Sequence, residues 1–290
     1  EAFAQMVETE WQAIKNGMEL TEDRINDVKS HFSEPAYSAT AKSNLSHEQH
    51  LANDTAFALW YKHNTVAHKK SGYRIAYVSL KAPDAPPGDI THQQLDALAD
   101  LADQFSFGLI RSTHRQNLVL ADIEQANLYP LWQQLDALNL ATPNINCITD
   151  MICCPGLDYC ALANAGSIDI AQDINNLFDN MDYIHDLGDL KINLSGCMNG
   201  CAHQSVGNIG ILGVDKKGVE WYQITLGGSS EEDAALGRRL GPAVSKDEIT
   251  PTIKTILEVY LGKRLEDENF LATVNRIGIS PFKDKVYAPN

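Results

Sequence analysis

The segments DMICCPGLDYCALANAG, residues 150–166, and NLSGCMNGCAHQ, residues 193–204, contain five of the six cysteines of this chain. Cys154 and Cys160 are separated by five residues, and Cys197 and Cys201 by three. Thiols of cytosolic proteins are kept reduced, so closely spaced cysteines in such a protein indicate a metal centre or a catalytic thiol rather than disulfides. The two segments therefore predict a site built from cysteine sulfur.

Both cysteine pairs lie at turns that we expect to lead into helices. A Pro/Gly turn precedes a helix predicted over roughly residues 157–180, and Gly196 precedes a second predicted helix. On that second helix Cys197 and Cys201 would stand at positions i and i+4, on one face. Unpaired N–H groups at a helix N-terminus stabilise thiolate charge, so this predicted geometry suits two sulfurs on one metal centre.

The spacing leaves three interpretations of the site open. Structural zinc sites usually use cysteines separated by two to four residues, so the wider gap between Cys154 and Cys160 counts against zinc. Four thiolates can hold a cubane iron–sulfur cluster, whose larger volume tolerates wider spacings. The third interpretation is a set of buried cysteines that are unrelated to one another. Cys147 and Cys153 lie outside the two pairs, and we expect Cys153 to be a small buried apolar residue.

The composition is that of a globular protein with an acidic surface. The 290 residues are 44% hydrophobic and 21% charged, and the formal net charge is −15. Such a charge disfavours nucleic acid and anionic membranes as partners. The sequence has no apolar run long enough to span a bilayer, and its first residues, EAFAQMVETEWQAIKNGMEL, lack the pattern of a signal peptide. We therefore expect a cytoplasmic location.

The chain before the cysteines divides into two parts. Residues 1–68 are predicted to be a polar helical lead-in or linker, in which Thr21 is a helix N-cap and residues 41–54 are an irregular connection. Its histidines are predicted to lie at the surface: His31, His47, His50, His63 and His68. Residues 69–142 follow the order strand, helix, two strands, helix, which indicates a small α+β sandwich. These elements are predicted at residues 73–80, 90–105, 107–113, 117–123 and 126–140.

The third part, residues 143–290, carries the cysteines. A strand is predicted at residues 190–195, directly before the second cysteine pair. The apolar runs at residues 206–214 and 219–228 predict a β-hairpin around the turn DKKG. A final amphipathic helix is predicted from the apolar residues Ile253, Ile256, Leu257, Tyr260 and Leu261.

The residues themselves carry a resemblance to a known family. CCPGLDYCALANA followed by LKINLSGCMNGCAHQSVGNIGILG resembles the cluster motif of the sirohaem-dependent nitrite and sulfite reductases. The more specific part is SGC-x-N-x-C, residues 195–201. PPGDIT and IRSTHRQNLVLADI, further upstream, resemble the ferredoxin-like half domain of that family. The resemblance covers about residues 70–290 and is to the C-terminal half of such an enzyme.

This resemblance implies a fold class and a set of cofactors. It implies a ferredoxin-like half domain and an α/β domain that binds a [4Fe-4S] cluster and sirohaem. With the helical N-terminal lead-in predicted above, the fold class is α+β. The cluster ligands implied are Cys154, Cys160, Cys197 and Cys201. Cys201 would also be the axial thiolate of the sirohaem iron, and Asn199 would lie at the cofactor. Ferredoxin or a flavoprotein would supply the electrons. They would pass through the cluster to sirohaem, where nitrite or sulfite undergoes a six-electron reduction.

The charge balance predicts that another part of the enzyme contributes to this chemistry. Sirohaem carboxylates and an oxyanion substrate both need basic partners, yet the chain has 23 Lys and Arg against 38 Asp and Glu. The local candidates are Arg115 and, less well placed, Arg111. Further basic residues with a predicted surface position are Lys216, Lys217, Arg238 and Arg239, while His203 is expected either near the cluster or on a helix surface. We expect an N-terminal half of the same polypeptide to supply most basic groups, so that this chain alone is inactive. The alternative is a non-catalytic iron–sulfur module with a structural or redox-sensing role.

Overall fold

The computed structural model describes residues 1–32, 34–38, 45–83, 85–178 and 180–288. The chain forms two compact units, residues 1–40 and residues 41–290. In the described part of the first unit, the helices are α1 (Ala2–Ile14), the 3-10 turn η1 (Lys15–Gly17) and α2 (Glu22–Ser30). Thr21 caps α2, because its side chain accepts a hydrogen bond from the backbone N–H of Arg24, and this N-cap prediction is confirmed.

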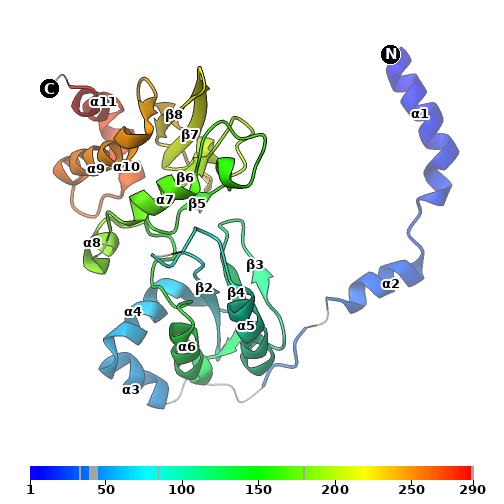
Figure 1. Cartoon of the computed structure of the whole chain (residues 1–290). Coiled ribbons are helices and arrows are strands. Elements are labelled where there is room, and N and C mark those ends of the chain that lie inside the picture. Colours follow the sequence, from blue (N-terminus) through cyan, green and yellow to red (C-terminus); the bar gives the residue numbers. More distant parts are fainter. Residues whose placement is uncertain (33, 39–44, 84, 179, 289–290) are drawn as a thin grey trace. The chain divides into compact units, whose positions relative to one another are not determined.

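The first sheet of the second unit is antiparallel and has the strand order β1-β2-β4-β3 (Figure 1). Its described strands are β1 (Thr65–Ala67), β2 (Tyr73–Val78), β3 (Arg111–Ser112) and β4 (Leu118–Glu124). The helices of this region are α3 (Leu45–Asn53), α4 (Thr55–Asn64), α5 (His92–Phe105), the 3-10 turn η2 (Gln125–Asn127) and α6 (Leu128–Ala137). Apolar side chains of α4, α5 and α6 share one buried core with those of β2 and β4. The predicted order of strand, helix, two strands and helix is confirmed.

The segment before this sheet differs from its prediction. Residues 45–53 of the predicted irregular connection form helix α3, while residues 41–44 lie outside the described part. The side chains of Phe57 and Trp60, on α4, are fully buried in the core of the first sheet, and β1 pairs with β2. Tertiary packing therefore places α4 and β1 with the half domain, although their polar composition suggested a lead-in.

The second sheet has the order β10-β8-β7-β6-β5, with β9 paired to β8 (Figure 1). Its described strands are β5 (Ile152–Cys153), β6 (Ile192–Ser195), β7 (Ile209–Lys216), β8 (Val219–Leu226), β9 (Arg238–Arg239) and β10 (Val244–Ser245). β5, β6 and β7 run parallel, whereas β7 and β8 form the predicted antiparallel hairpin. Lys217 and Gly218 at its turn both have positive φ, as a tight hairpin turn requires.

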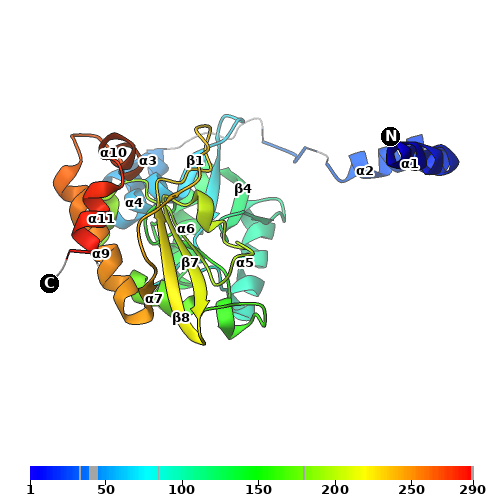
Figure 2. The same ribbon diagram turned by 90° about the horizontal axis from the view of Figure 1, so that it is seen from above.

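Helices complete this second region. They are α7 (Ile168–Asn175), α8 (Met181–Asp186), α9 (Lys246–Lys263), α10 (Phe270–Ile277) and α11 (Ser280–Val286), with short 3-10 turns η3 (Gly156–Asp158) and η4 (Gln204–Val206). α9, α10 and α11 group together beside the hairpin (Figure 2). Their apolar side chains share a core with β6, β7 and β8, so the α/β prediction for this region is confirmed. Among the described helices, none combines the length and apolarity that crossing a bilayer needs.

Two helix predictions near the cysteines are wrong. The helix expected over residues 157–180 is present only as η3, an irregular stretch and then α7. The irregular stretch is held to the end of β6, because the N–H groups of Asn164 and Ala165 both donate to the carbonyl of Gly196. The chain after Gly196 forms successive turns up to η4, and the predicted helix is absent from this described segment.

Candidate metal centre

The two cysteine segments meet at one edge of the second sheet. Cys154 follows β5, and Cys197 follows β6 after Gly196. Since β5 and β6 are parallel neighbours with Cys153 paired to Leu194, their carboxyl ends lie at the same edge. The N–H of Cys154 also donates to the carbonyl of Leu194 at 3.0 Å, which extends the pairing to the first cysteine.

Gly196 joins the two cysteine segments directly. Its backbone N–H donates to the sulfur of Cys154 at 3.0 Å, although the two residues are 42 positions apart. A Cβ atom at position 196 would lie 2.6 Å from the carbonyl oxygen of Ala165 and 2.9 Å from the Cα of Gly156. Only glycine fits this close approach, and the N–H–sulfur contact is of the kind that stabilises charge on cluster sulfur.

Cys160 is brought to the same edge by the turn that starts at Gly156. The N–H of Cys160 donates to the Gly156 carbonyl at 2.9 Å. Gly156 has a positive φ of 57°, and a Cβ there would lie 2.4 Å from the Ser167 hydroxyl. That hydroxyl lies 3.5 Å from the Cys154 sulfur, so the loop of Cys160 is packed against the first ligand candidate.

The segment of Cys197 and Cys201 is held in turns by two polar side chains of β6. The Ser195 hydroxyl accepts the N–H of Ala202 at 3.1 Å, and the Asn193 amide donates to the carbonyls of Ala202 and His203. These bonds occupy backbone groups that a helix would use for itself. Gly200 and His203 also have positive φ, which interrupts any helix at these points. Cys197 and Cys201 therefore lie on successive turns and not at positions i and i+4 of a helix.

The site is closed on one side and open on the other. Cys154 and Cys197 are buried, Cys160 is half-buried, and Cys201 is exposed. Ile152 and Ala202 form a small buried apolar cluster with Cys154. The turns that carry the cysteines also carry exposed apolar side chains, here called the apolar rim: Leu157 at 47%, Tyr159 at 84%, Leu162 at 74% and Met198 at 87% exposure. Asn199 is exposed on the turn between the last two cysteines.

These features fit an iron–sulfur cluster better than the other two interpretations. The cysteines are not scattered through the core, because the Cys154 sulfur touches the peptide that precedes Cys197. Glycine at position 196 leaves room for a bulky inorganic group near the backbone, and its N–H already points at sulfur. The exposed Cys201 and the apolar rim give space for a second, larger group on the open side.

Arg115, a predicted anion-facing residue, binds a buried carboxylate. Its Nε lies 3.3 Å from Oδ2 of Asp150, and its Nη2 donates to the Asp150 carbonyl at 2.9 Å. The same carboxylate accepts hydrogen bonds from Lys81 Nζ at 3.2 Å and from the Asn117 amide at 2.8 Å. The side chains of Lys81 and Asp150 are both fully buried, and burial lowers the pKa of Lys81 while Asp150 opposes that shift. Asp150 precedes β5 whereas Cys154 follows it, so this ion pair lies toward the other end of the strand.

Arg115 also lines a pocket of about 400 Å3 at that end of the sheet. The basic residues of its lining are His63, His114, Arg115 and Lys191, and its acidic residues are Asp150 and Glu231. Lys191 forms an ion pair with Glu231. Sequence reasoning missed the Lys81–Asp150 pair, because an isolated lysine next to a strand gives no signal of burial.

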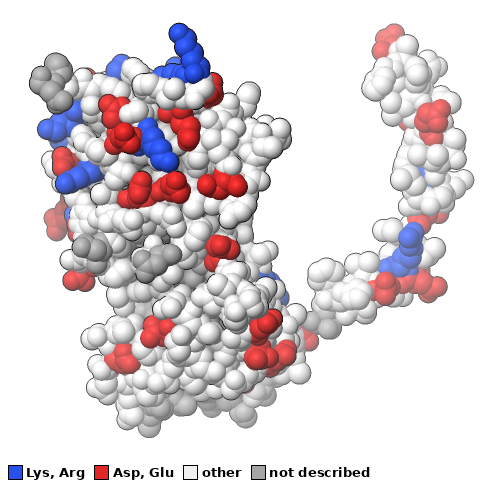
Figure 3. Space-filling model, viewed as in Figure 1, with Lys and Arg blue, Asp and Glu red and all other residues white. Residues whose placement is uncertain are grey.

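The other predicted basic residues are dispersed. Arg111 is exposed on β3, His203 is exposed, and Lys216 lies 4.1 Å from the ring centroid of Trp221 on the hairpin. Arg239 donates to the Gln223 side chain at 2.7 Å. On the face shown in Figure 3, Asp and Glu are spread over the surface, and Lys and Arg gather mainly over the region of the second sheet.

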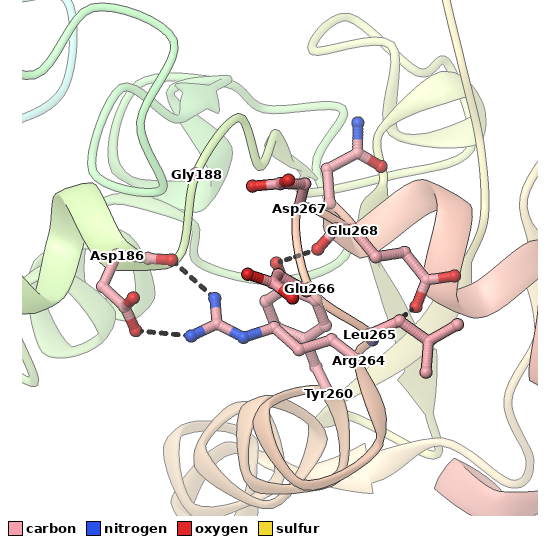
Figure 4. A pocket seen from close by; sticks show the side chains of 9 residues that line it. Asp186, Gly188, Tyr260, Arg264, Leu265, Glu266, Asp267 and Glu268 are labelled. Atoms are coloured by element: carbon pink, nitrogen blue, oxygen red, sulfur yellow. Dashed lines mark hydrogen bonds and ion pairs between the residues drawn. The ribbon is translucent and has the colours of Figure 1, made fainter.

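A second pocket, of about 420 Å3, is too acidic to receive an oxyanion. Its lining includes Asp186, Glu266, Asp267 and Glu268 (Figure 4). Arg264 is the basic residue of this lining, and its guanidinium donates to the Asp186 carboxylate at 2.7 Å.

Most of the histidines predicted at the surface are not there. His31 is exposed, but His47 is buried, and His50 stacks on Tyr129 with ring centroids 3.6 Å apart. The ring of His68 lies 3.3 Å from the buried carboxylate of Asp122. His63 stacks on His185. Cys153 is buried as expected, and burial raises the pKa of its thiol.

Comparison with known proteins identifies matching families and relatives. The family model described as nitrite and sulphite reductase 4Fe-4S domain matches residues 144–289, and the model described as nitrite/sulfite reductase ferredoxin-like half domain matches residues 69–138. "Sulfite reductase [ferredoxin] 2" of Mycolicibacterium paratuberculosis is 33% identical over 200 residues, which are 63% of this chain and 35% of that protein.

Two further similarities bear on the length of the chain. "Sulfite reductase, assimilatory-type" of Nitratidesulfovibrio vulgaris is 27% identical over 207 residues, which are 70% of this chain and 90% of that protein. The solved structure of Mycobacterium tuberculosis NirA protein superposes with a TM-score of 0.64 and 30% identity, over 76% of this chain and 41% of that chain. The chain thus spans about a third of the length of the mycobacterial relative but nearly all of the shorter one.

Proposed function

Because this chain belongs to the nitrite and sulphite reductase 4Fe-4S family, we propose that it is the cluster- and sirohaem-carrying part of an assimilatory-type nitrite or sulfite reductase. The family match confirms the expected oxidoreductase class and the [4Fe-4S] cofactor. The observation that supports the site assignment is the 3.0 Å contact between the Cys154 sulfur and the N–H of Gly196, which lies next to Cys197 in the chain.

In this proposal Cys154, Cys160, Cys197 and Cys201 hold the cluster. The buried Cys154 and Cys197 anchor it to the sheet edge, while Ile152 and Ala202 exclude water behind them. The N–H of Gly196 stabilises the additional negative charge of the reduced cluster, because hydrogen bonds to sulfur favour that state.

The exposed Cys201 is the residue assigned to sirohaem. Its sulfur would be shared between the cluster and the sirohaem iron, and Asn199 on the same turn would lie beside the macrocycle. Sirohaem, when bound, supplies an iron at which an oxyanion can be reduced. The apolar rim would then be covered by the macrocycle and would keep water from the shared sulfur.

Nitrite or sulfite is the proposed substrate, and ferredoxin is the proposed donor. Ferredoxin appears in the name of the mycobacterial relative, which supports this donor over a flavoprotein. Arg115 and Arg111 remain candidates for contact with sirohaem or the anion. The ion pair with Asp150 makes Arg115 the weaker of the two, because its guanidinium already has a carboxylate partner.

We further propose that the active enzyme needs basic groups from an N-terminal half. The cysteine segments, residues 155–166 and 196–204, contain exposed apolar side chains but no Lys or Arg, and the chain as a whole is acidic. The much longer mycobacterial relative supports this proposal, while the shorter relative, which this chain covers almost completely, supports activity without a second half.

A cofactor and activity measurement on this chain tests the function. The anaerobically reconstituted chain is expected to contain iron, sulfide and sirohaem, with the strong Soret and red-region absorption of the macrocycle. A broad absorption without those bands would refute sirohaem binding and favour the non-catalytic iron–sulfur module. Reduction of nitrite and sulfite by reduced methyl viologen is then compared for this chain with and without an added N-terminal half. Activity of the chain alone would refute the need for that half.

A further inference from the structure

His63, Cys147 and His185 form a cluster of potential metal ligands outside the cysteine turns. His63 lies near the end of α4, Cys147 in the loop before β5, and His185 on α8. One ligand atom of each residue lies within 4.8 Å of the ligand atoms of the other two. The two imidazole rings stack with centroids 3.8 Å apart and planes inclined by 7°. The three potential ligands therefore come from α4, from α8 and from the loop before β5, and Figure 1 labels both helices.

One ring nitrogen of His63 lacks a hydrogen-bond partner in the described part of the chain. Its Nε2 is buried and makes no hydrogen bond within the part of the chain that the structure describes. Native proteins rarely leave a buried polar atom unpaired, because the atom gives up its bonds to water without compensation. A metal ion bound by this nitrogen would supply the missing partner.

One ring nitrogen of His185 is bonded as it commonly is in metal-ligating histidines. Its Nε2 lies 2.8 Å from the carbonyl oxygen of Pro143. A carbonyl only accepts hydrogen bonds, so Nε2 carries the proton and Nδ1 keeps a free lone pair. Histidine ligands of metals commonly donate their other N–H to a carbonyl or carboxylate in this way, which fixes the tautomer.

We propose that His63, Cys147 and His185 bind one zinc ion, at a site distinct from the four-cysteine centre. Two imidazoles and one thiolate are ligands that Zn2+ prefers, and the fourth position is left for water. His63 lines the 400 Å3 pocket described above, together with Ile145 and Asn146, so an ion can enter from that pocket. On binding, the Cys147 thiol releases its proton to solvent and the sulfur becomes the anionic ligand.

Zinc binding requires a small rearrangement. Zinc–ligand bonds of about 2.0–2.3 Å place tetrahedral ligand atoms roughly 3.4–3.8 Å apart, which lies within the 4.8 Å limit of this cluster. Parallel stacked rings cannot both point a lone pair at one ion, so one imidazole must tilt out of the stack. Both rings are only half-buried, which leaves room for that rotation. The bound ion would then link α4, which packs on the first sheet, to α8 in the region of the second sheet.

The test uses the chain with its iron–sulfur cluster assembled, so that the four-cysteine centre is occupied. The protein is treated with a chelator, given one equivalent of Zn2+, and freed of unbound metal, and zinc and iron are then counted by mass spectrometry. We expect one zinc per chain in the wild type. Cys147→Ser and His185→Gln are expected to lower zinc at least tenfold while iron is unchanged. His50→Gln is the matched control, because His50 is also half-buried and stacked, on Tyr129.

X-ray absorption at the zinc edge identifies the ligands independently of these variants. Two nitrogen neighbours at about 2.0–2.1 Å and one sulfur at about 2.3 Å are expected. A shell of sulfur alone would place zinc at the four-cysteine centre and overturn the proposal. Zinc content below a tenth of an equivalent in the wild type, or equal zinc in wild type, Cys147→Ser and His185→Gln, would overturn it as well.

Discussion

The backbone N–H of Gly196 donates to the sulfur of Cys154 at 3.0 Å and thereby connects the ends of two parallel strands. This contact depends on the absence of a side chain at position 196, where a Cβ would lie 2.6 Å from the Ala165 carbonyl oxygen. The proposed cluster site is therefore coupled to the packing of the backbone around it, and small changes there should affect metal content.

Gly196→Ala is expected to abolish cluster assembly and to lower the free energy of unfolding by about 1–3 kcal/mol, because the added methyl group must displace backbone atoms. Iron and sulfide content and urea denaturation measure the two effects. Gly262→Ala in α9 is the control, since its Cβ would meet nothing within 4 Å. That variant should gain roughly 0.5–1 kcal/mol from helix propensity and keep its iron. Normal iron in Gly196→Ala would contradict the role given to this glycine.

Cys201→Ser is expected to lose the sirohaem absorption bands and to lower the iron content, because a serine oxygen is a poor substitute for a shared thiolate. Cys153→Ser is the control, because the Cys153 thiol is buried in the core of the second sheet and donates to the Cys154 carbonyl. A serine hydroxyl can make the same bond, so both cofactors should remain. Equal losses in the two variants would overturn the ligand assignment.

Asp150→Ala is expected to destabilise the chain by about 3–5 kcal/mol, because Lys81 would remain buried without a counter-charge and Arg115 would lose its partner. Adding Lys81→Met should recover a substantial part of the loss. Chemical denaturation of the single and double variants measures this coupling. Lys246→Met breaks the exposed pair with Asp169 and should cost about 0–1 kcal/mol. Equal losses in the free energy of unfolding for Asp150→Ala and Lys246→Met would show that the buried pair stabilises the chain no more than the exposed pair does.

The contribution of Glu268 to stability should depend on pH. Hydrogen bonds from Arg276 chiefly, and also from the Leu265 N–H and Thr273, lower the pKa of Glu268 to about 2 from its usual value near 4.5. A carboxyl group with a lowered pKa in the folded state stabilises that state above its unfolded pKa, and this contribution is lost as the pH falls toward 2. Thermal unfolding of wild type and Glu268→Gln should therefore differ at pH 6 and converge between pH 4.5 and pH 2. A constant difference in Tm over that range would contradict this pairing.

The sequence predicts local features of this fold well and distant contacts poorly. The hairpin at residues 206–228 and the helix at residues 90–105 are confirmed, because their signals lie in neighbouring residues. The helix predicted after Gly196 is wrong, because Ser195 and Asn193 bind backbone groups of the following turn. At the candidate site, the cysteine spacing indicated the correct class of cofactor. The distant partner of Arg115 had no local signal, since Asp150 is 35 positions away.

The buried carboxylate of Asp150 also bears on where this chain can be divided. Its partners Lys81, Arg115 and Asn117 belong to the region matched by the half-domain family, whereas Asp150 belongs to the region matched by the 4Fe-4S family. Cutting the chain between the two matched regions would expose a lysine and an arginine on one fragment and an unpaired acid on the other. We therefore expect the two matched regions to fold as one unit, although sequence comparison recognises them as two families.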